Sequence, residues 1–293
     1  MQEINLAHLI RYEVSIMTKM KFAKIILILI LVFPFYGYAL EVEEEEILLG
    51  PRGPRVEHIF LEQESIIAFF EVTDIDEYKK LIPSTFSMPE KPLCRVIISD
   101  FYKMESGPPF LEAVVAILAK FKKPKSGEEI LAWHPLGMSV TSEEALWGRL
   151  GGFPKVLRKV TFESHTNKYV GISYARDGNT PTLKLTLELK KGKPTQDEKR
   201  FLDFVSPIPV LTIDRRFGGK VISRGIIGGG GVKHKIYECE KVAPKIWKIE
   251  FGDCSIEYPK DPKNYLYRLG IGKFITGYWL KQKVRYQVQY KEE

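Results

Sequence analysis

The hydrophobic positions of this chain fall into many short runs, separated by glycine, proline and polar residues. Several runs are rich in β-branched and aromatic residues, which is typical of buried strands. No helical period is sustained beyond about twelve residues, and no internal repeat is visible. Strands are therefore predicted over residues 65–72, 93–102, 130–140 with an interruption at Pro135, 157–165, 168–175, 183–190, 210–217, 220–227, 232–240, 246–251 and 281–290.

Helical signals are few and short. Asp74 and Glu77 form a capping box that begins a helix, and Pro83 ends it. Short helices are also predicted at 142–144 and 197–204, whereas periodicity alone does not assign the apolar run 111–121. The pattern predicts a mainly β (α+β) fold. Its single domain is an antiparallel β-barrel, expected to be closed, with a few short helices outside it.

The N-terminal region has the pattern of a secretory signal peptide. Lysines at 19, 21 and 24 precede the apolar run 25–33, and a small-residue site ends at Ala39. The run is shorter than the ~20 residues that span a bilayer. We therefore expect a signal peptide at 1–39, an acidic linker at 40–50 and a secreted or periplasmic domain at 51–293 without a stable membrane span. An uncleaved anchor is the alternative.

Composition and charge narrow the function classes. With 293 residues, 44% of them hydrophobic, the chain can bury a substantial core. The net charge is +7, but acidic and basic residues alternate and no broad basic field with aromatics is visible, so we expect no nucleic-acid partner. The three cysteines include no C-x-x-C and the histidines are scattered, so no metal site is expected. A homo-oligomer remains open.

The most informative stretch is W-G-R-L-G-G-F-P-K-V-L-R-K, residues 147–159. Glycines 151 and 152 permit unusual backbone angles, and Pro154 fixes the direction in which Lys155 leaves the chain. Phe153 supplies an apolar wall. Desolvation penalises an ammonium and favours the free amine, which is what a Schiff-base lysine needs. The alternative is a surface turn with an ordinary solvated lysine.

Gly148-Arg149 followed by G-F-P-K resembles the active-site segment of the acetoacetate decarboxylase family. P-R-G-P at 51–54 and a Thr73-Asp74 helix ending in proline are further points of resemblance. The resemblance implies a cone-shaped barrel over roughly residues 48–290, a strand at 111–121 and a Schiff base on Lys155. It also matches Glu105 to a family glutamate near the lysine, whereas local sequence equally fits an exposed turn carboxylate. Two departures stand out. The family's glutamate after Gly-Arg is missing, and Val156 replaces a second lysine.

Substrate recognition is the least determined feature. Two positions where family members place a polar or charged pair for the substrate carboxylate are matched here to Glu64 and Ile97. Because a negative Glu64 would repel a carboxylate, the missing cation is assigned to Arg95 or Arg149. Phe153 and Val156 are expected to line the same pocket.

These observations predict an exported lyase that decarboxylates a β-keto acid through Lys155 and needs no metal or organic cofactor. Glu105 is the expected partner in proton transfer. An aldolase or dehydratase acting on another oxo acid through the same Schiff base is one alternative. A barrel that only binds an apolar small molecule is the other.

Overall fold

The computed structural model describes residues 58–84, 86–104, 107–122, 127–146, 153–213 and 236–291. All of them belong to one compact unit, Arg52–Glu293. The predicted signal peptide and acidic linker, Glu105, Arg149 and the strand predicted at 220–227 lie outside the described residues.

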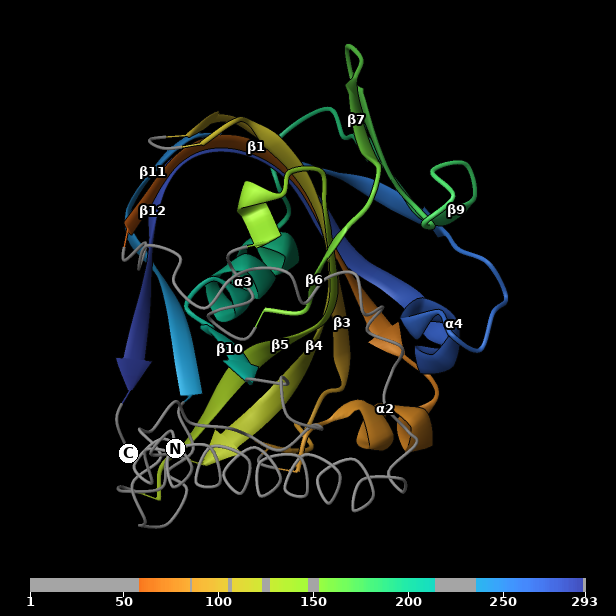
Figure 1. Cartoon of the computed structure of the whole chain (residues 1–293), viewed down its shortest axis with the longest axis vertical. Helices are drawn as coiled ribbons and strands as arrows, with labels where there is room; N and C mark the ends of the chain where they lie inside the picture. Colours follow the sequence, from red (N-terminus) through yellow and green to blue (C-terminus); the bar gives the residue numbers. More distant parts are fainter. Residues whose placement is uncertain are drawn as a thin grey trace, which may run out of the picture. The chain divides into compact units, whose positions relative to one another are not determined.

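The described chain is built on a single twelve-stranded sheet (Figure 1). Its main path runs β10-β5-β4-β3-β1-β12-β11-β9-β8-β7, and the short strands β2 and β6 pair with β4 and β5. The strands are β1 (His58–Val72), β2 (Phe86–Ser87), β3 (Leu93–Met104), β4 (Phe110–Lys122), β5 (Glu129–Val140), β6 (Lys155–Leu157), β7 (Val160–Ser164), β8 (Lys168–Tyr174), β9 (Pro181–Leu189), β10 (Val210–Ile213), β11 (Ile236–Glu257) and β12 (Ile271–Lys291).

The mainly β, mostly antiparallel prediction is confirmed, but full closure of the barrel is not. The sheet curls strongly, and β10 bridges the two sides of the curl. Four register pairs join β10 to β11, whereas a single parallel pair, Val210 with Trp133, joins it to β5. With so short a link, the sheet is a curled half-barrel rather than a continuous closed one.

Three helices complete the described chain: α2 (Ile75–Leu81), α3 (Gln196–Val205) and α4 (Tyr265–Leu269). Helix α2 begins at Asp74 as predicted, because the Asp74 side chain accepts a hydrogen bond from the amide of Glu77. Helix α3 has a complete capping box between Thr195 and Glu198. Within the described part of the chain, no helix has the length and apolar character needed to cross a membrane.

The concave face of the sheet holds one hydrophobic core. Phe69 of β1 and Trp133 of β5 lie on this face, with ring centroids 5.6 Å apart. Phe201 of α3 packs edge-on against Phe69 at 5.1 Å, and Leu202 and Val205 join the same cluster. Helix α3 therefore lies inside the curl (Figure 1), whereas the sequence predicted that the helices would lie outside it.

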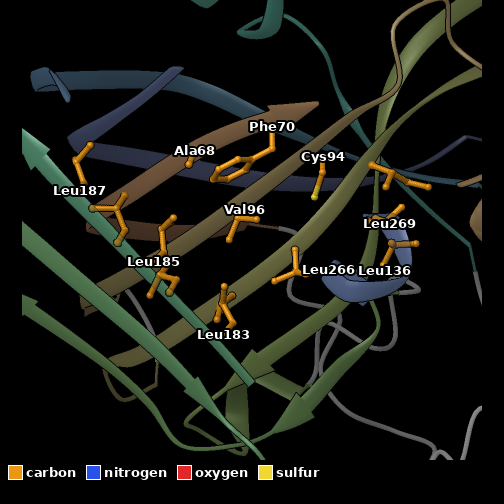
Figure 2. Packing of buried hydrophobic residues seen from close by; sticks show 14 of the residues in the cluster. Ala68, Phe70, Cys94, Val96, Leu136, Leu183, Leu185, Leu187, Leu266 and Leu269 are labelled. Carbon is orange, nitrogen blue, oxygen red and sulfur yellow. The ribbon is translucent and has the colours of Figure 1, made fainter. Parts of the chain in front are cut away.

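A second core covers the convex face of the sheet. There β9 supplies alternate leucines, Leu183, Leu185 and Leu187, against Ala68 and Phe70 of β1 and Cys94 and Val96 of β3 (Figure 2). Leu266 and Leu269 of α4 extend the cluster. Strands β1, β3 and β4 are thus covered on both faces, which explains why their sequences read as nearly continuous apolar runs.

Strand β11 differs most from the sequence prediction. Two separate strands, 232–240 and 246–251, were predicted, but the structure has one strand of 22 residues. Its pairing with β12 continues past Pro244 through register shifts between Val242 and Lys245 and between Ile246 and Lys248. A proline is tolerated at such a bulge because its missing N–H is not needed by the ladder. Cys239 and Cys254 consequently lie far apart along one strand.

Candidate active site

The turn that carries Lys155 is held from both sides. The amide of Lys155 donates to the carbonyl of Phe153 at 2.8 Å, which makes a tight three-residue turn around Pro154. The Pro154 carbonyl accepts a hydrogen bond from the amide of Met138 in β5 at 3.1 Å. Lys155 is therefore not in a free surface turn. It begins the short strand β6, which pairs in parallel with β5.

A β-bulge in β5 determines on which face of the sheet the Lys155 side chain lies. The register with β4 shifts between Val115–Gly137 and Ala116–Pro135, leaving one extra residue in β5. Such an extra residue reverses the alternation of side chains. Trp133 faces the concave side before the bulge, and Met138 and Val140 face that side after it. Lys155 is in register with Met138 and so is brought to the concave side.

Lys155 meets the carboxylate of Glu112 there. The Nζ atom lies 2.9 Å from Oε2 of Glu112, and the two side chains are only 12% and 10% exposed. Glu112 is a strand residue of β4, directly opposite Val140 of β5 and Ser99 of β3. The ion pair thus links a residue of the sheet interior to the lysine turn.

Aromatic rings surround the pair. Nζ of Lys155 lies 5.5 Å from the centre of the Phe110 ring and 5.9 Å from that of Phe153. Phe110 stacks on Phe101 at 4.5 Å, and Val140 is fully buried beside them. Ring faces attract a cation, so these contacts are compatible with a charged nitrogen at this position.

Nζ of Lys155 has two kinds of neighbour, the aromatic rings and the carboxylate of Glu112 at 2.9 Å. Only the apolar neighbours were predicted from the sequence. Oε2 of Glu112 has no hydrogen bond of good geometry among the described residues, so its contact with Lys155 is an ion pair by distance. A carboxylate in this position can accept a proton from the ammonium and return it later.

No group of three His, Cys, Asp or Glu side chains within the described ranges is arranged to hold a metal ion. The chemistry that these residues can supply is therefore that of a half-buried amine, an adjacent carboxylate and an apolar wall.

The sequence model of the acetoacetate decarboxylase family matches residues 49–292. The chain belongs to this family. The match spans the whole curled sheet, the lysine turn and Glu112. A search of curated proteins gave no match.

Solved structures of acetoacetate decarboxylase-like proteins share the fold. One from a study of acetoacetate decarboxylase is 15% identical, with a TM-score of 0.65 over 85% of this chain and 98% of that one. The acetoacetate decarboxylase of Legionella pneumophila is 16% identical, with a TM-score of 0.61 over 87% and 97% of the two chains. MppR, an enduracididine biosynthesis enzyme solved with pyruvate, is 10% identical, with a TM-score of 0.57 over 87% and 97%.

Some of the pocket residues predicted for this family member lie on the concave face. Phe153 approaches Lys155 as described, and Ile97 of β3 packs against the concave core. Arg95 faces the same side, but its guanidinium stacks on the Trp133 ring at 4.5 Å, four residues along β3 from Ser99. Arg95 therefore contacts the aromatic core next to α3.

Two other predicted pocket residues face away from the lysine. Val156 alternates with Lys155 and is in register with Ser139, whose hydroxyl bonds to Ser173 on the convex side. Glu64 is paired with Lys281 at 2.6 Å, and Trp279, two residues before Lys281 on β12, belongs to the convex core. The structure thus separates Glu64 and Val156 from the Lys155–Glu112 pair. Glu105 and Arg149 lie outside the described residues.

Sequence reasoning missed Glu112. The family glutamate was matched to Glu105, before the strand, whereas the carboxylate that meets Lys155 lies within the apolar run 110–122. A single carboxylate in a strand whose other members are almost all apolar was the available signal, because a buried charge needs a partner.

Proposed function

We propose that this chain is a Schiff-base lyase of the acetoacetate decarboxylase type that acts on an oxo acid through Lys155. The observation that carries the proposal is the ion pair between Lys155 and Glu112 on the concave face, beside Phe110 and Phe153. An amine held by a carboxylate that can take its proton, next to an apolar wall, is a suitable nucleophile for a ketone.

Decarboxylation of a β-keto acid would proceed as follows. Glu112 takes a proton from Nζ, and the free amine attacks the ketone carbon. Loss of water from the carbinolamine gives an iminium cation. The bond to the carboxylate carbon then breaks, carbon dioxide leaves, and the electron pair moves through the new C=C bond to neutralise the nitrogen. Protonation of the enamine carbon and hydrolysis release the ketone and restore the amine.

Glu112 is proposed for two tasks in this sequence. Its negative charge stabilises the iminium relative to neutral intermediates, because opposite charges at short range attract strongly where water is excluded. Its oxygens also receive and return the protons that the amine and the enamine exchange. The assignment of proton transfer to Glu105 stays a prediction, because Glu105 lies outside the described residues.

A related reaction is the second candidate. The similar protein MppR has been solved with the condensation product of pyruvate and imidazole 4-carboxaldehyde. An aldol or dehydration reaction on another oxo acid uses the same iminium but keeps the carboxylate. Of the two cations predicted for a substrate carboxylate, Arg149 lies outside the described residues, and Arg95 places its guanidinium over the Trp133 ring.

The reaction type can be tested by product analysis. The mature protein is incubated with acetoacetate, with longer 3-oxo acids, and with pyruvate plus an aldehyde, and carbon dioxide and the organic products are measured. Release of carbon dioxide with formation of the ketone supports the lyase. Condensation without carbon dioxide favours the alternative, and no product with any acid favours a carrier. Requirement for an added metal or organic cofactor would contradict a Schiff base acting alone.

We also propose that the domain is exported. Support comes from Lys24, the apolar run 25–33 and the small-residue site at Ala39, which together have the pattern of a signal peptide.

A further inference from the structure

A row of buried polar side chains crosses the concave face and reaches the position opposite Glu112. The amide Nε2 of Gln63 donates to Oγ of Ser65 at 2.9 Å, and Oγ of Ser65 lies 2.8 Å from Oγ of Ser99. Ser65 and Ser99 are 0% and 3% exposed. Ser65, Ser99 and Glu112 are directly opposite one another on the adjacent strands β1, β3 and β4.

These side chains lie in an otherwise apolar place. On the same face, Ile67, Phe69 and Ile97 belong to the core around α3. Phe101, Phe110 and Val140 form the apolar cluster on the other side. Burying two hydroxyl groups here costs free energy unless all their hydrogen bonds are made. Two alanines would pack here as well, so packing does not explain why both positions are serine.

The hydroxyl hydrogens of Ser65 and Ser99 indicate what this row of polar side chains does. One lone pair of Ser65 accepts from Gln63 and, since either hydroxyl can be the donor in the Ser65–Ser99 bond, the Ser65 hydroxyl hydrogen can go to Ser99. The hydroxyl hydrogen of Ser99 then remains, and no bond between described residues uses it. Directly opposite, Oε2 of Glu112 lacks a hydrogen bond among the described residues. Facing residues of an antiparallel pair have their Cβ atoms about 4.5–5.5 Å apart, so a rotation of either side chain brings donor and acceptor together.

We propose that Gln63, Ser65 and Ser99 form a hydrogen-bond relay that positions Glu112 against Lys155. The inference rests on the proposed Schiff-base function. Each hydroxyl that accepts a hydrogen bond becomes a stronger donor, so the relay delivers a polarised O–H to the carboxylate. That bond keeps the Glu112 carboxyl group turned toward Nζ while the nitrogen passes from ammonium through amine to iminium. Ser65 and Ser99 are positioning residues and do not touch the substrate.

The convex face supplies a matched control. Oγ of Ser173 in β8 donates to Oγ of Ser139 in β5 at 3.0 Å, and Ser173 is also buried. This pair is also a hydroxyl–hydroxyl bond, partly buried, but it lies on the opposite side of the sheet from Lys155. Loss of either pair should affect stability similarly, and only loss of the concave pair should affect the lysine.

The test measures the rate at which borohydride traps pyruvate or acetoacetate on the protein. Ser99→Ala should lower this rate by about 10- to 100-fold, the factor expected for a hydrogen bond to a charged group. Ser65→Ala should give a smaller loss, and the double variant Ser65→Ala/Ser99→Ala should match Ser99→Ala alone because Ser65 acts through Ser99. Ser139→Ala and Ser173→Ala should trap at the wild-type rate. An unchanged rate in Ser99→Ala, or multiplying losses in the double variant, would overturn the relay.

A second measurement does not depend on any oxo acid. In urea unfolding, Ser99→Ala should reduce the folding equilibrium constant several-fold in the wild-type background and much less in the Glu112→Met background, which has no acceptor. Equal losses in both backgrounds would show that Ser99 does not bond to Glu112 and would overturn the relay. If wild type traps no oxo acid, the proposed function fails. The unfolding cycle would then still decide whether the hydrogen bond exists.

Discussion

Nζ of Lys155 lies 2.9 Å from Oε2 of Glu112, although the two residues belong to strands that are not neighbours in the sequence. Their meeting depends on two local irregularities, the bulge in β5 at Pro135 and the parallel pairing of β6 with β5. The contact places a single carboxylate beside the amine, in a chain that has Val156 where the family pattern has a second lysine.

Glu112→Gln should lower turnover by about 10²–10⁴-fold, because an amide cannot take the proton from Lys155. The side chain keeps its shape, so the urea midpoint should change little. Carbon dioxide release and urea unfolding are the measurements. Glu64→Gln is the matched control, since it breaks another lysine–glutamate pair, with Lys281, on the convex face. Turnover of Glu112→Gln within twofold of wild type would remove Glu112 from the reaction.

Glu105→Gln separates the glutamate matched from sequence from the one found beside Lys155. We expect Glu105→Gln to lose less turnover than Glu112→Gln, because Glu112 lies next to the amine. The same carbon dioxide assay compares the two variants directly. A loss as large as that of Glu112→Gln would mean that both carboxylates act on the substrate.

Gly171→Ala should destabilise the protein by about 1–3 kcal/mol while leaving borohydride trapping unchanged. A Cβ at Gly171 of β8 would lie 2.6 Å from Cδ1 and Cγ2 of Ile98, where the outer strands pack on β3. Chemical denaturation gives the stability. Ile98→Ala removes the side chain that the new methyl group would meet. The double variant Gly171→Ala/Ile98→Ala should therefore lose less stability than the sum of the two single losses. Additive losses would contradict the close approach.

Asp100→Asn should stabilise the protein near neutral pH by roughly 0.5–1 kcal/mol, a value reduced for its partial exposure. Burial, and then the charge of Glu64, raise the pKa of Asp100 above its ordinary value of 3.8. The folded state therefore binds this proton more tightly than the unfolded state. Ionisation costs stability as the pH rises through the folded pKa. Urea unfolding should show the gain of Asp100→Asn at neutral pH and its disappearance below about pH 3.8, where both states are protonated. A gain that is independent of pH would contradict this cause.

The export proposal predicts that protein recovered from its native host begins at Leu40 and lies outside the cytoplasm. N-terminal sequencing of the purified protein, together with cell fractionation, decides the question. A full-length chain recovered from the cytosol would contradict the proposal.

Much of the fold could be predicted because the strands alternate with strong turn signals. Asp74 and Pro83 bounded α2 correctly, and the strands at 168–174 and 181–189 lie close to their predicted ranges. Strand β11 was predicted as two strands, 232–240 and 246–251, whereas its pairing with β12 continues through Pro244 at a bulge. Pairing with a distant strand can thus outweigh the local preference of the sequence, and the local sequence does not show which strand that is.

The two halves of the candidate site differed in how far they could be predicted. Lys155 could be predicted because it follows Pro154 in a short motif whose residues restrict the local backbone. Glu112 lies in a strand covered on both faces, where alternation disappears and periodicity indicates nothing about orientation. Its role arises only when the bulge in β5 turns Val140 and β6 to the same face.

Mass spectrometry of the intact protein shows whether Lys155 forms a covalent bond with an oxo acid. Wild type, Lys155→Ala and Lys159→Ala are incubated with a panel of oxo acids and borohydride. Lys159 is a nearby exposed lysine that stacks on Tyr174. We predict one adduct on wild type and on Lys159→Ala, with the mass of the acid, or of its decarboxylated ketone, less one oxygen. Lys155→Ala should carry none. An unmodified wild type with every acid, or an adduct that persists in Lys155→Ala, would contradict the account.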